Sequence, residues 1–291
     1  MAEAQRTAKR SRFDFGYFGY QLKRSPLTMV GLIMVVLVLI VVIFAPVFAT
    51  HDPNAIDLRA RLAPPSMAHF FGTDEVGRDI YSRILFGGRQ SIAVGFFVVF
   101  LAGLTGTVLG ALSGLIGGRT DTVIMRLMDV VLSVPSLALI LALAAALGPS
   151  LVNAALAIAI VRIPFYVRLV RGQALIVREM AYVKAAHTFR AGRLHILRWH
   201  ILPNTLSPVI VQGTLDLGST ILLASALSFI GLGAQQPTAE WGAMVATGRN
   251  YILDQWWYSG FPGFAILFTA TGFNLFGDGV RDMLDPRQKA R

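Results

Sequence analysis

The sequence contains no cysteine among its 291 residues, and only 14% of its residues are charged. The absence of cysteine excludes disulfides, thiolate nucleophiles and cysteine-ligated metals. Soluble domains carry about 25% charged residues. The shortage of charge, together with 55% hydrophobic residues and a mean hydropathy of +0.61, indicates an integral membrane protein.

Nucleotide-binding and metalloprotease motifs are missing as well. None of the four lysines follows a glycine, so the chain has no G-K-[ST] phosphate-binding loop. The five histidines do not have zinc-protease spacing. We therefore expect no catalytic residue, no metal site and no cofactor bound by this chain. An ATP-driven step would place ATP and Mg on a separate ATPase polypeptide.

Six apolar segments are long enough to cross a bilayer, for which a helix needs about 20 mainly apolar residues. They cover residues 27–48, 91–116, 122–147, 152–170, 208–229 and 261–276. Pro26 suits the first position of the first helix, with Ser25 as N-cap. Pro135 and Pro164 predict kinks in the third and fourth helices. The predicted fold class is an all-α integral membrane protein with six transmembrane helices.

Basic residues give the orientation of the spans. Lys and Arg concentrate in cytoplasmic loops of membrane proteins, and a cytoplasmic N-terminus leaves only six of the 26 basic residues outside. Both termini are therefore predicted to be cytoplasmic, and the pI near 10.5 requires no nucleic-acid partner. The predicted organisation is an N-terminal segment 1–26, a first span 27–48, an external loop 49–90, a core 91–276 with a cytoplasmic loop 174–204 and an external loop 231–260, and a tail 277–291.

Two external segments have recognisable local patterns. Residues 71–90 are predicted to form an amphipathic helix along the membrane, capped by Thr73 and stabilised by i,i+4 ion pairs. These pairs are Asp74 with Arg78 and Asp79 with Arg83. Residues 231–260 are rich in aromatic side chains, which is typical of an interfacial belt. The predicted belt residues are Trp241, Tyr251, Trp256, Trp257 and Tyr258.

Glycine recurs at every fourth position of the second span. The residues are Gly106, Gly110, Gly114 and Gly118. On a helix they fall on one face and leave a smooth groove where another helix can approach closely. Packing within this chain and an interface with another subunit both explain such a groove, and both remain open.

Charged residues inside the predicted spans need a partner or water, because an ionisable group in hydrocarbon is costly. Asp129 follows Arg126 by three residues, so the two can pair on one helix face. Asp216 lies in the fifth span without a charged neighbour on its own helix, and Arg162 in the fourth is similar. These three, Asp129, Arg162 and Asp216, are candidates for a transport path, with a structural role as the alternative for Asp129.

A basic segment, YVKAAHTFRAGRLHILRWHILPN at residues 182–204, separates the fourth and fifth spans. Its apolar spacing predicts a helix over residues 174–190, a turn at Gly192, and a second short helix that contains Leu194 and Leu197. On the cytoplasmic side, this helix-turn-helix can bind anionic lipid or dock into a groove of a cytoplasmic partner.

The segment resembles a motif of bacterial ABC importer permeases, which reads Glu-Ala-Ala, three residues, Gly, nine residues, then Ile-x-Leu-Pro. The corresponding residues here are Lys184, Ala185 and Ala186, then Arg190 at the Gly position, His200 at the Ile position, and Leu202 and Pro203. FGTDEVGRDIYSRILFGGRQS (71–91), LSFIGLGAQQPTAEWG (227–242) and FNLFGDGVRDMLDPR (273–287) are similar to the C-type permease subunit of dipeptide and oligopeptide importers. The resemblance spans nearly the whole chain, with Ala224 standing where the family often has Glu.

The resemblance implies a type I ABC importer permease in a bacterial inner membrane, with spans two to six as its core. It also implies a heterodimer with a B-type permease, two ATPase subunits that hold ATP and Mg, and an extracytoplasmic substrate-binding protein. ATP-driven closure of the ATPase pair would rock the spans between inward- and outward-open states. The residues expected to contact an ATPase subunit are Lys184, Ala185, Ala186, Phe189, Arg190, Gly192, Arg193, Leu194 and Leu197.

Two departures from the motif lead to hypotheses. Lys184 replaces a glutamate, so the matching ATPase surface is expected to be more acidic than usual, unless Lys184 finds another acidic partner or faces solvent. Gly192 is expected to supply the turn that Arg190 cannot, so that Gly192→Val would uncouple ATP hydrolysis from uptake.

Other functions are less well supported by the residues. A stand-alone secondary transporter or channel normally needs several intramembrane carboxylates or broken helices, for which Asp129 and Asp216 offer little. A scaffold with no transport role leaves the basic segment and the mid-span Asp216 unexplained. Under the family resemblance, short peptides are the expected cargo, and nickel chelates or glutathione are the alternatives.

Overall fold

The computed structural model describes residues 25–284, and its regular elements in that range are helices. The longer ones are α3 (Pro26–Ile43), α5 (Ile80–Ile116), α6 (Gly118–Leu132), α7 (Ser136–Leu147), α8 (Leu151–Arg178), α11 (Leu202–Phe229) and α13 (Trp256–Leu284). The shorter ones are α4 (Ala45–Phe48), α9 (Ala181–Thr188), α10 (Arg193–Ile196) and α12 (Trp241–Gly248), with single turns at Leu58–Ala60, Leu197–Ile201 and Arg249–Tyr251. Most of the predicted N-terminal segment and the end of the predicted tail lie outside the described residues.

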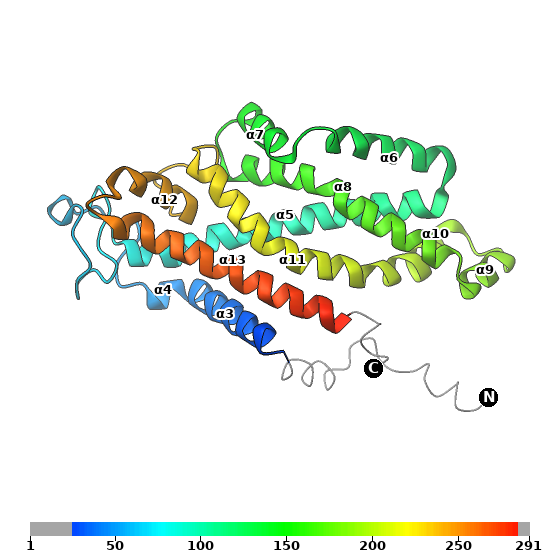
Figure 1. The fold of residues 1–291 in the computed structure, drawn as a ribbon, viewed down its shortest axis with the longest axis horizontal. Coiled ribbons are helices and arrows are strands. Elements are labelled where there is room, and N and C mark those ends of the chain that lie inside the picture. Colours follow the sequence, from blue (N-terminus) through cyan, green and yellow to red (C-terminus); the bar gives the residue numbers. More distant parts are fainter. Residues whose placement is uncertain (1–24, 285–291) are drawn as a thin grey trace.

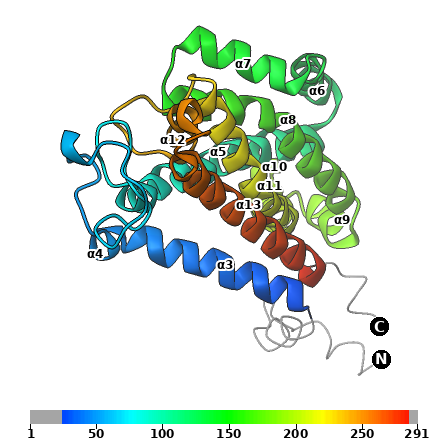
Figure 2. The ribbon, with the colours of Figure 1, turned by 60° about the vertical axis from the view of Figure 1, so that its left-hand side comes forward.

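The helices form an elongated bundle (Figures 1 and 2). α5, α8, α11 and α13 run side by side, α3 packs on α13, and α6 and α7 lie along α8. One end of the bundle carries α9 and α10; the opposite end, here called the loop end, carries α12 and residues 49–79. The start of α3 and the end of α13 both point away from the loop end.

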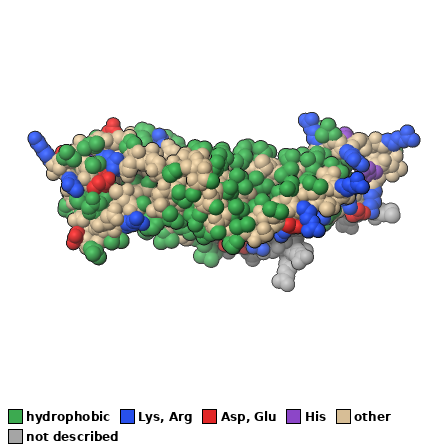
Figure 3. All heavy atoms as spheres, turned by 90° about the horizontal axis from the view of Figure 1, so that it is seen from above, with side chains coloured by type: hydrophobic (Ala, Val, Ile, Leu, Met, Phe, Trp, Pro, Cys, Tyr) green, Lys and Arg blue, Asp and Glu red, His purple; other side chains and the backbone are tan. Residues whose placement is uncertain are grey.

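The surface matches a membrane environment. Hydrophobic side chains cover the middle of the molecule, and Lys and Arg gather at its two ends (Figure 3). Five helical stretches are long and apolar enough to cross a bilayer, and α6 with α7 makes a sixth if the bent pair counts as one span. The predicted all-helical membrane fold is therefore confirmed.

The third span differs from the prediction of a kinked helix over residues 122–147. α6 ends at Leu132, α7 begins at Ser136, and the two axes are bent by 88°. Pro135 is the N-cap of α7. A proline has no N–H to donate and disfavours helical geometry at the residue before it, so the helix stops there instead of bending slightly. Pro164, in contrast, stays within the continuous helix α8.

The predicted amphipathic helix over residues 71–90 is wrong in its first half. Gly72 and Gly77 adopt φ values of 75° and 81°, which are incompatible with a right-handed helix. A Cβ on Gly77 would collide with the Asp57 carbonyl oxygen. Asp79 instead caps α5 by accepting a hydrogen bond from the Ser82 amide at 2.8 Å. Residues 80–90 are the buried first turns of the second span, not a separate helix on the membrane surface.

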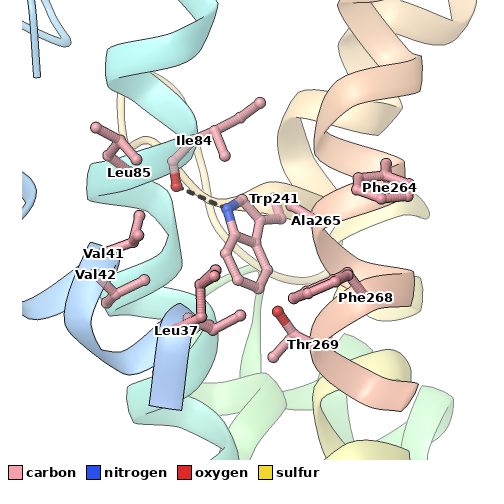
Figure 4. A pocket seen from close by; sticks show the side chains of 11 residues that line it. Leu37, Val41, Val42, Ile84, Leu85, Trp241, Phe264, Ala265, Phe268 and Thr269 are labelled. Atoms are coloured by element: carbon pink, nitrogen blue, oxygen red, sulfur yellow. Dashed lines mark hydrogen bonds between the residues drawn. The ribbon is translucent and has the colours of Figure 1, made fainter. Parts of the chain in front are cut away.

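Trp241 is an interior anchor, not a member of an interfacial belt. It is only 2% exposed, and its indole N–H donates to the Ile84 carbonyl oxygen at 2.8 Å (Figure 4). Its ring lies among side chains of α3, α5 and α13. Tyr258 is also buried, whereas Trp256 is exposed. The loop of residues 231–260 folds back onto the bundle through α12, which packs on α11 and α13.

Candidate functional site

A compact corner joins the fourth and fifth spans at the end of the bundle opposite the loop end. We define the corner as residues 181–196, which comprise α9, a turn and α10. Val183 and Ile196 are fully buried in it and belong to one apolar cluster with Val170 and Val177 of α8. Because both of its helices contribute to the core, the corner is packed firmly against α8 and the start of α11.

The sequence pattern predicted that the second helix of the corner ends before the fifth span begins. In the structure it does not end there. α10, the turn Leu197–Ile201 and α11 follow one another as a single helical stretch from Arg193 to Phe229. Pro203 directly follows the π-helical turn Leu197–Ile201, and the helical stretch continues through it into α11. The second helix of the corner is therefore continuous with the fifth span.

The predicted contact residues gather on the outside of this corner. Lys184, Ala185, Phe189, Arg190, Gly192, Arg193 and Leu194 are exposed, and Ala186 and Leu197 are half-buried. Phe189 and Leu194 stand out because they are apolar and 86% and 76% exposed. Trp199, which the sequence analysis did not select, is 62% exposed. It is the one tryptophan in the basic segment. Its position in that segment could have identified it as a candidate contact residue.

Arg190, not Gly192, makes the turn. Arg190 has φ 59°, and Gly192 has φ −66° and ψ 154° as the N-cap of α10. The Ala191 amide donates to the Ala186 carbonyl oxygen at 3.0 Å and the Arg190 amide to that of His187 at 2.9 Å, the two bonds of a Schellman helix end. The left-handed conformation costs a non-glycine residue about 1–2 kcal/mol.

The expectation for Gly192→Val is therefore corrected. Gly192 has an extended backbone that any residue can adopt, and no described atom lies within 4 Å of a Cβ placed on it. The left-handed residue falls instead at position 190, where the related motif has its glycine.

Lys184 finds an acidic partner within its own chain. Its Nζ lies 3.0 Å from Oε2 of Glu179, at the end of α8. The hydrogen bond from Lys184 lowers the pKa of the Glu179 carboxyl. Both side chains are exposed, so the pair contributes little to stability. It nevertheless accounts for the lysine without requiring an unusually acidic partner surface.

A second polar cluster lies between α8 and α11 at mid-bundle. Arg162 Nη1 lies 3.6 Å from Asp216 Oδ1, and Arg162 Nη2 donates to Ser219 Oγ at 3.1 Å. Gln212 Nε2 donates to Asp216 Oδ1 at 3.2 Å. The other carboxylate oxygen, Asp216 Oδ2, is buried, and the Asp216 carboxylate interacts with the Tyr166 hydroxyl of α8. The partner of Asp216 thus comes from the neighbouring span, which the pattern of its own helix could not show.

Asp129 has a different role from these two. The predicted pair with Arg126 is wrong, because Asp129 Oδ1 lies 2.7 Å from Nη2 of Arg168 on α8. About two turns earlier on α6, Asp121 accepts two hydrogen bonds from Arg171 at 2.6 and 2.7 Å. These pairs hold α6 against α8. Both members of the Asp129 pair are about half exposed, so Asp129 is not part of the Arg162–Asp216 cluster.

Three of the four repeated glycines form the contact between α5 and α8. A Cβ on Gly106 would meet Tyr166, one on Gly110 would lie 2.5 Å from the Val167 carbonyl oxygen, and one on Gly114 would lie 2.6 Å from Ala174 Cβ. Their groove is therefore filled by this chain and is not a subunit interface. Gly118 does not take part: it lies beyond α5 with φ 55°, and no described atom comes within 4 Å of its Cβ position.

Comparison with known proteins places this geometry in context. Residues 106–290 match the family described as binding-protein-dependent transport system inner membrane component, and residues 15–65 match the N-terminal TM domain of oligopeptide transport permease C. A probable D,D-dipeptide transport system permease protein of Escherichia coli is 65% identical over 98% of this chain and 95% of its own. Dipeptide transport system permease proteins of Alkalihalophilus pseudofirmus and E. coli are 46% and 45% identical, over 93% and 94% of this chain and 89% and 93% of their own lengths.

Proposed function

Because this chain belongs to the family of binding-protein-dependent transport system inner membrane components, we propose that it forms half of the membrane pathway of an ATP-driven importer for short peptides. The corner docks onto a separate ATPase subunit on the cytoplasmic side, and a B-type permease supplies the other half of the pathway. An extracytoplasmic binding protein delivers the peptide. Both termini face the cytoplasm in this arrangement.

The exposed apolar side chains of the corner are the observation that supports docking. Phe189 and Leu194 of the corner, and Trp199 in the turn that follows it, project from a part of the chain that is itself firmly packed. Large apolar side chains at the centre of an interface commonly carry most of its binding energy. The corner also lies at one of the two ends where Lys and Arg gather, away from the hydrophobic middle that faces lipid. Its own basic residues, Lys184, Arg190 and Arg193, fit the excess of Lys and Arg expected on the cytoplasmic side.

Leu194→Asp is expected to detach the ATPase subunits. Losing such a contact costs about 2 kcal/mol or more, which corresponds to roughly a 30-fold loss of affinity. The measurements are copurification of ATPase subunits with the tagged chain and peptide uptake by cells. Leu253→Asp is the matched control, because Leu253 is 96% exposed in the loop before α13. Equal copurification and uptake in both variants would refute docking through the corner.

The Arg162–Asp216 cluster suits a zwitterionic peptide. A guanidinium pairs with a carboxylate, and a carboxylate pairs with an ammonium. Arg162 and Asp216 can therefore separate, so that Arg162 binds the carboxylate end of a peptide and Asp216 binds its ammonium end. The 3.6 Å separation between Arg162 Nη1 and Asp216 Oδ1 favours such an exchange. We therefore place Arg162 and Asp216 on the translocation path and leave Asp129 off it.

Asp216→Asn and Arg162→Gln are each expected to reduce peptide uptake roughly tenfold or more, because each leaves a partly desolvated charge unpaired. The double variant distinguishes the two roles. If the pair only stabilises the bundle, removing both charges restores uptake; if it contacts the peptide, uptake stays low. Asp129→Asn serves as the control, with uptake close to that of the unaltered protein.

The relatives suggest the cargo, and an uptake experiment distinguishes the two possible energy sources. The names of the relatives point to dipeptides, including D,D-dipeptides, and we propose dipeptides ahead of nickel chelates or glutathione. Broken helices such as α6–α7 also occur in secondary transporters. Uptake by proteoliposomes that requires internal ATP and persists without an ion gradient supports the importer. Uptake driven by an ion gradient alone would favour the secondary transporter.

A further inference from the structure

Three side chains that lie 18 and 10 positions apart in the sequence meet at the loop end. Asp79 Oδ1 lies 2.9 Å from Nδ1 of His69 and 3.8 Å from Nδ1 of His51. The two imidazole rings have centroids 4.7 Å apart and are tilted by 31°. One ligand atom from each residue can be chosen so that all of them lie within 4.8 Å of one another. His51 follows α4, His69 lies in the loop, and Asp79 caps α5.

The cluster has the composition of a transition-metal site. Two imidazole nitrogens and a carboxylate oxygen are common ligands of Zn²⁺, and sites with three protein ligands keep a fourth position for water. Atoms bound to one tetrahedral Zn²⁺ lie about 3–3.5 Å apart, between the two distances observed from Asp79. His69 is half-buried and Asp79 buried, whereas His51 is exposed, so solvent reaches one side of the cluster.

The surrounding loop explains what a metal would do there. Between His51 and Phe70 most side chains are exposed, and the one helical element is the single turn Leu58–Ala60. A loop of this length is costly to order, and a metal clip that joins its ends removes much of that cost. His51 and Asp79 are near the two ends of this loop.

We propose that His51, His69 and Asp79 bind one divalent transition-metal ion of the zinc type, which clips residues 49–79 to the start of α5. This replaces the expectation of no metal site, which rested on histidine spacing within the sequence. The three ligands are separated by 18 and 10 positions, so the fold and not a local motif brings them together. The site is independent of the corner and of the Arg162–Asp216 cluster.

Zinc titration of the full transport complex tests this proposal. The complex is purified without a histidine tag, stripped with a chelator, and titrated with ZnCl₂ by calorimetry. We expect the unaltered complex to bind one more ion than complexes carrying His51→Ala or His69→Ala. His187→Ala is the control, because His187 is exposed on α9 at the other end of the bundle, and it should bind as many ions as the unaltered complex. Asp79 is left intact because it caps α5.

Two further readouts separate a bound metal from a hydrogen-bonded His–Asp pair. At a hundred times the dissociation constant, Zn²⁺ should raise the unfolding temperature by roughly 5 °C in the unaltered complex and the His187 variant but not in the other two. Co²⁺ should give the visible absorption of a four-coordinate ion in the same two samples. Equal stoichiometry and equal thermal shifts in all four samples would overturn the proposal, leaving the cluster as a hydrogen-bonded pair with a neighbouring histidine.

Discussion

Replacing Asp74 with alanine is expected to lower the free energy of unfolding by about 3–5 kcal/mol, because it removes the buried counter-ion of Arg83 and one of the two counter-ions of Arg78. Asp74 Oδ2 lies 2.6 Å from Nε of Arg78 and 3.6 Å from Nε of Arg83. All three side chains are buried. Asp74 Oδ1 also accepts hydrogen bonds from the amides of Val76 and Arg78, so the substitution breaks the turn before α5 as well.

The consequence extends beyond the turn, because the two arginines join separate segments. Arg78 donates to Gln236 at 3.1 Å, and Arg83 donates to the Pro53 carbonyl oxygen at 2.9 Å. Glu75 of the same network accepts from the Tyr258 hydroxyl at the start of α13. Loss of Asp74 should therefore loosen the whole loop end.

Thermal and chemical unfolding of the purified complex measure this loss. Asp254→Ala is the matched control, because Asp254 is an exposed carboxylate at the same end, and its removal should change stability by less than about 0.5 kcal/mol. Limited proteolysis should cut residues 49–79 faster in the Asp74 variant only. If the two variants unfold at the same temperature, the buried network does not stabilise the loop end.

The sequence predicted most reliably what depends on composition within a single segment. The apolar runs located five of the spans because a bilayer sets both their length and their polarity. The ends of those spans were less accurate: α8 continues to Arg178, eight positions beyond the predicted 170. The last turns of α8 contain Arg171 and Arg178, so the apolar run ends before the helix does.

Ion pairs between different spans could not be predicted from the sequence of a single helix. Arg162 with Asp216, and Arg168 with Asp129, are each separated by tens of positions. The local rule of pairs three or four residues apart gave Arg126 for Asp129, which is wrong. The same rule did find Asp74 with Arg78, but in a turn and not in a helix. The ion pairs between different helices depend on how α6, α8 and α11 lie beside one another, which is set by the fold.

The glycine repeat is the case in which a sequence pattern and a packed contact coincide. Spacing by four put Gly106, Gly110 and Gly114 on one face of α5, and the structure places α8 of the same chain against that face. The pattern alone could not say which helix approaches. It also included Gly118, because periodicity continues past the point where the helix ends.

Gly110→Val is expected to destabilise the protein by about 3 kcal/mol or to prevent its assembly, since overpacking forces backbones apart. A Cβ at this position would lie 2.5 Å from the Val167 carbonyl oxygen and 2.9 Å from Val170 Cβ. These atoms belong to the backbone and to a branched Cβ, so rotation of a flexible side chain cannot relieve the contact. α8 would have to move away from α5, and the α8 side of the Arg162–Asp216 cluster would move with it.

Gly172→Val on α8 is the matched control. Gly172 is exposed and helical, and among the described residues nothing lies within 4 Å of its Cβ position. The same Gly-to-Val change there alters helix propensity without touching the contact. The measurements are the yield of monodisperse complex and its unfolding temperature, followed by uptake of a dipeptide. A stable, active Gly110→Val protein would mean that α5 and α8 do not pack at the distance described, and the position assigned to Arg162 on the path would fall with it.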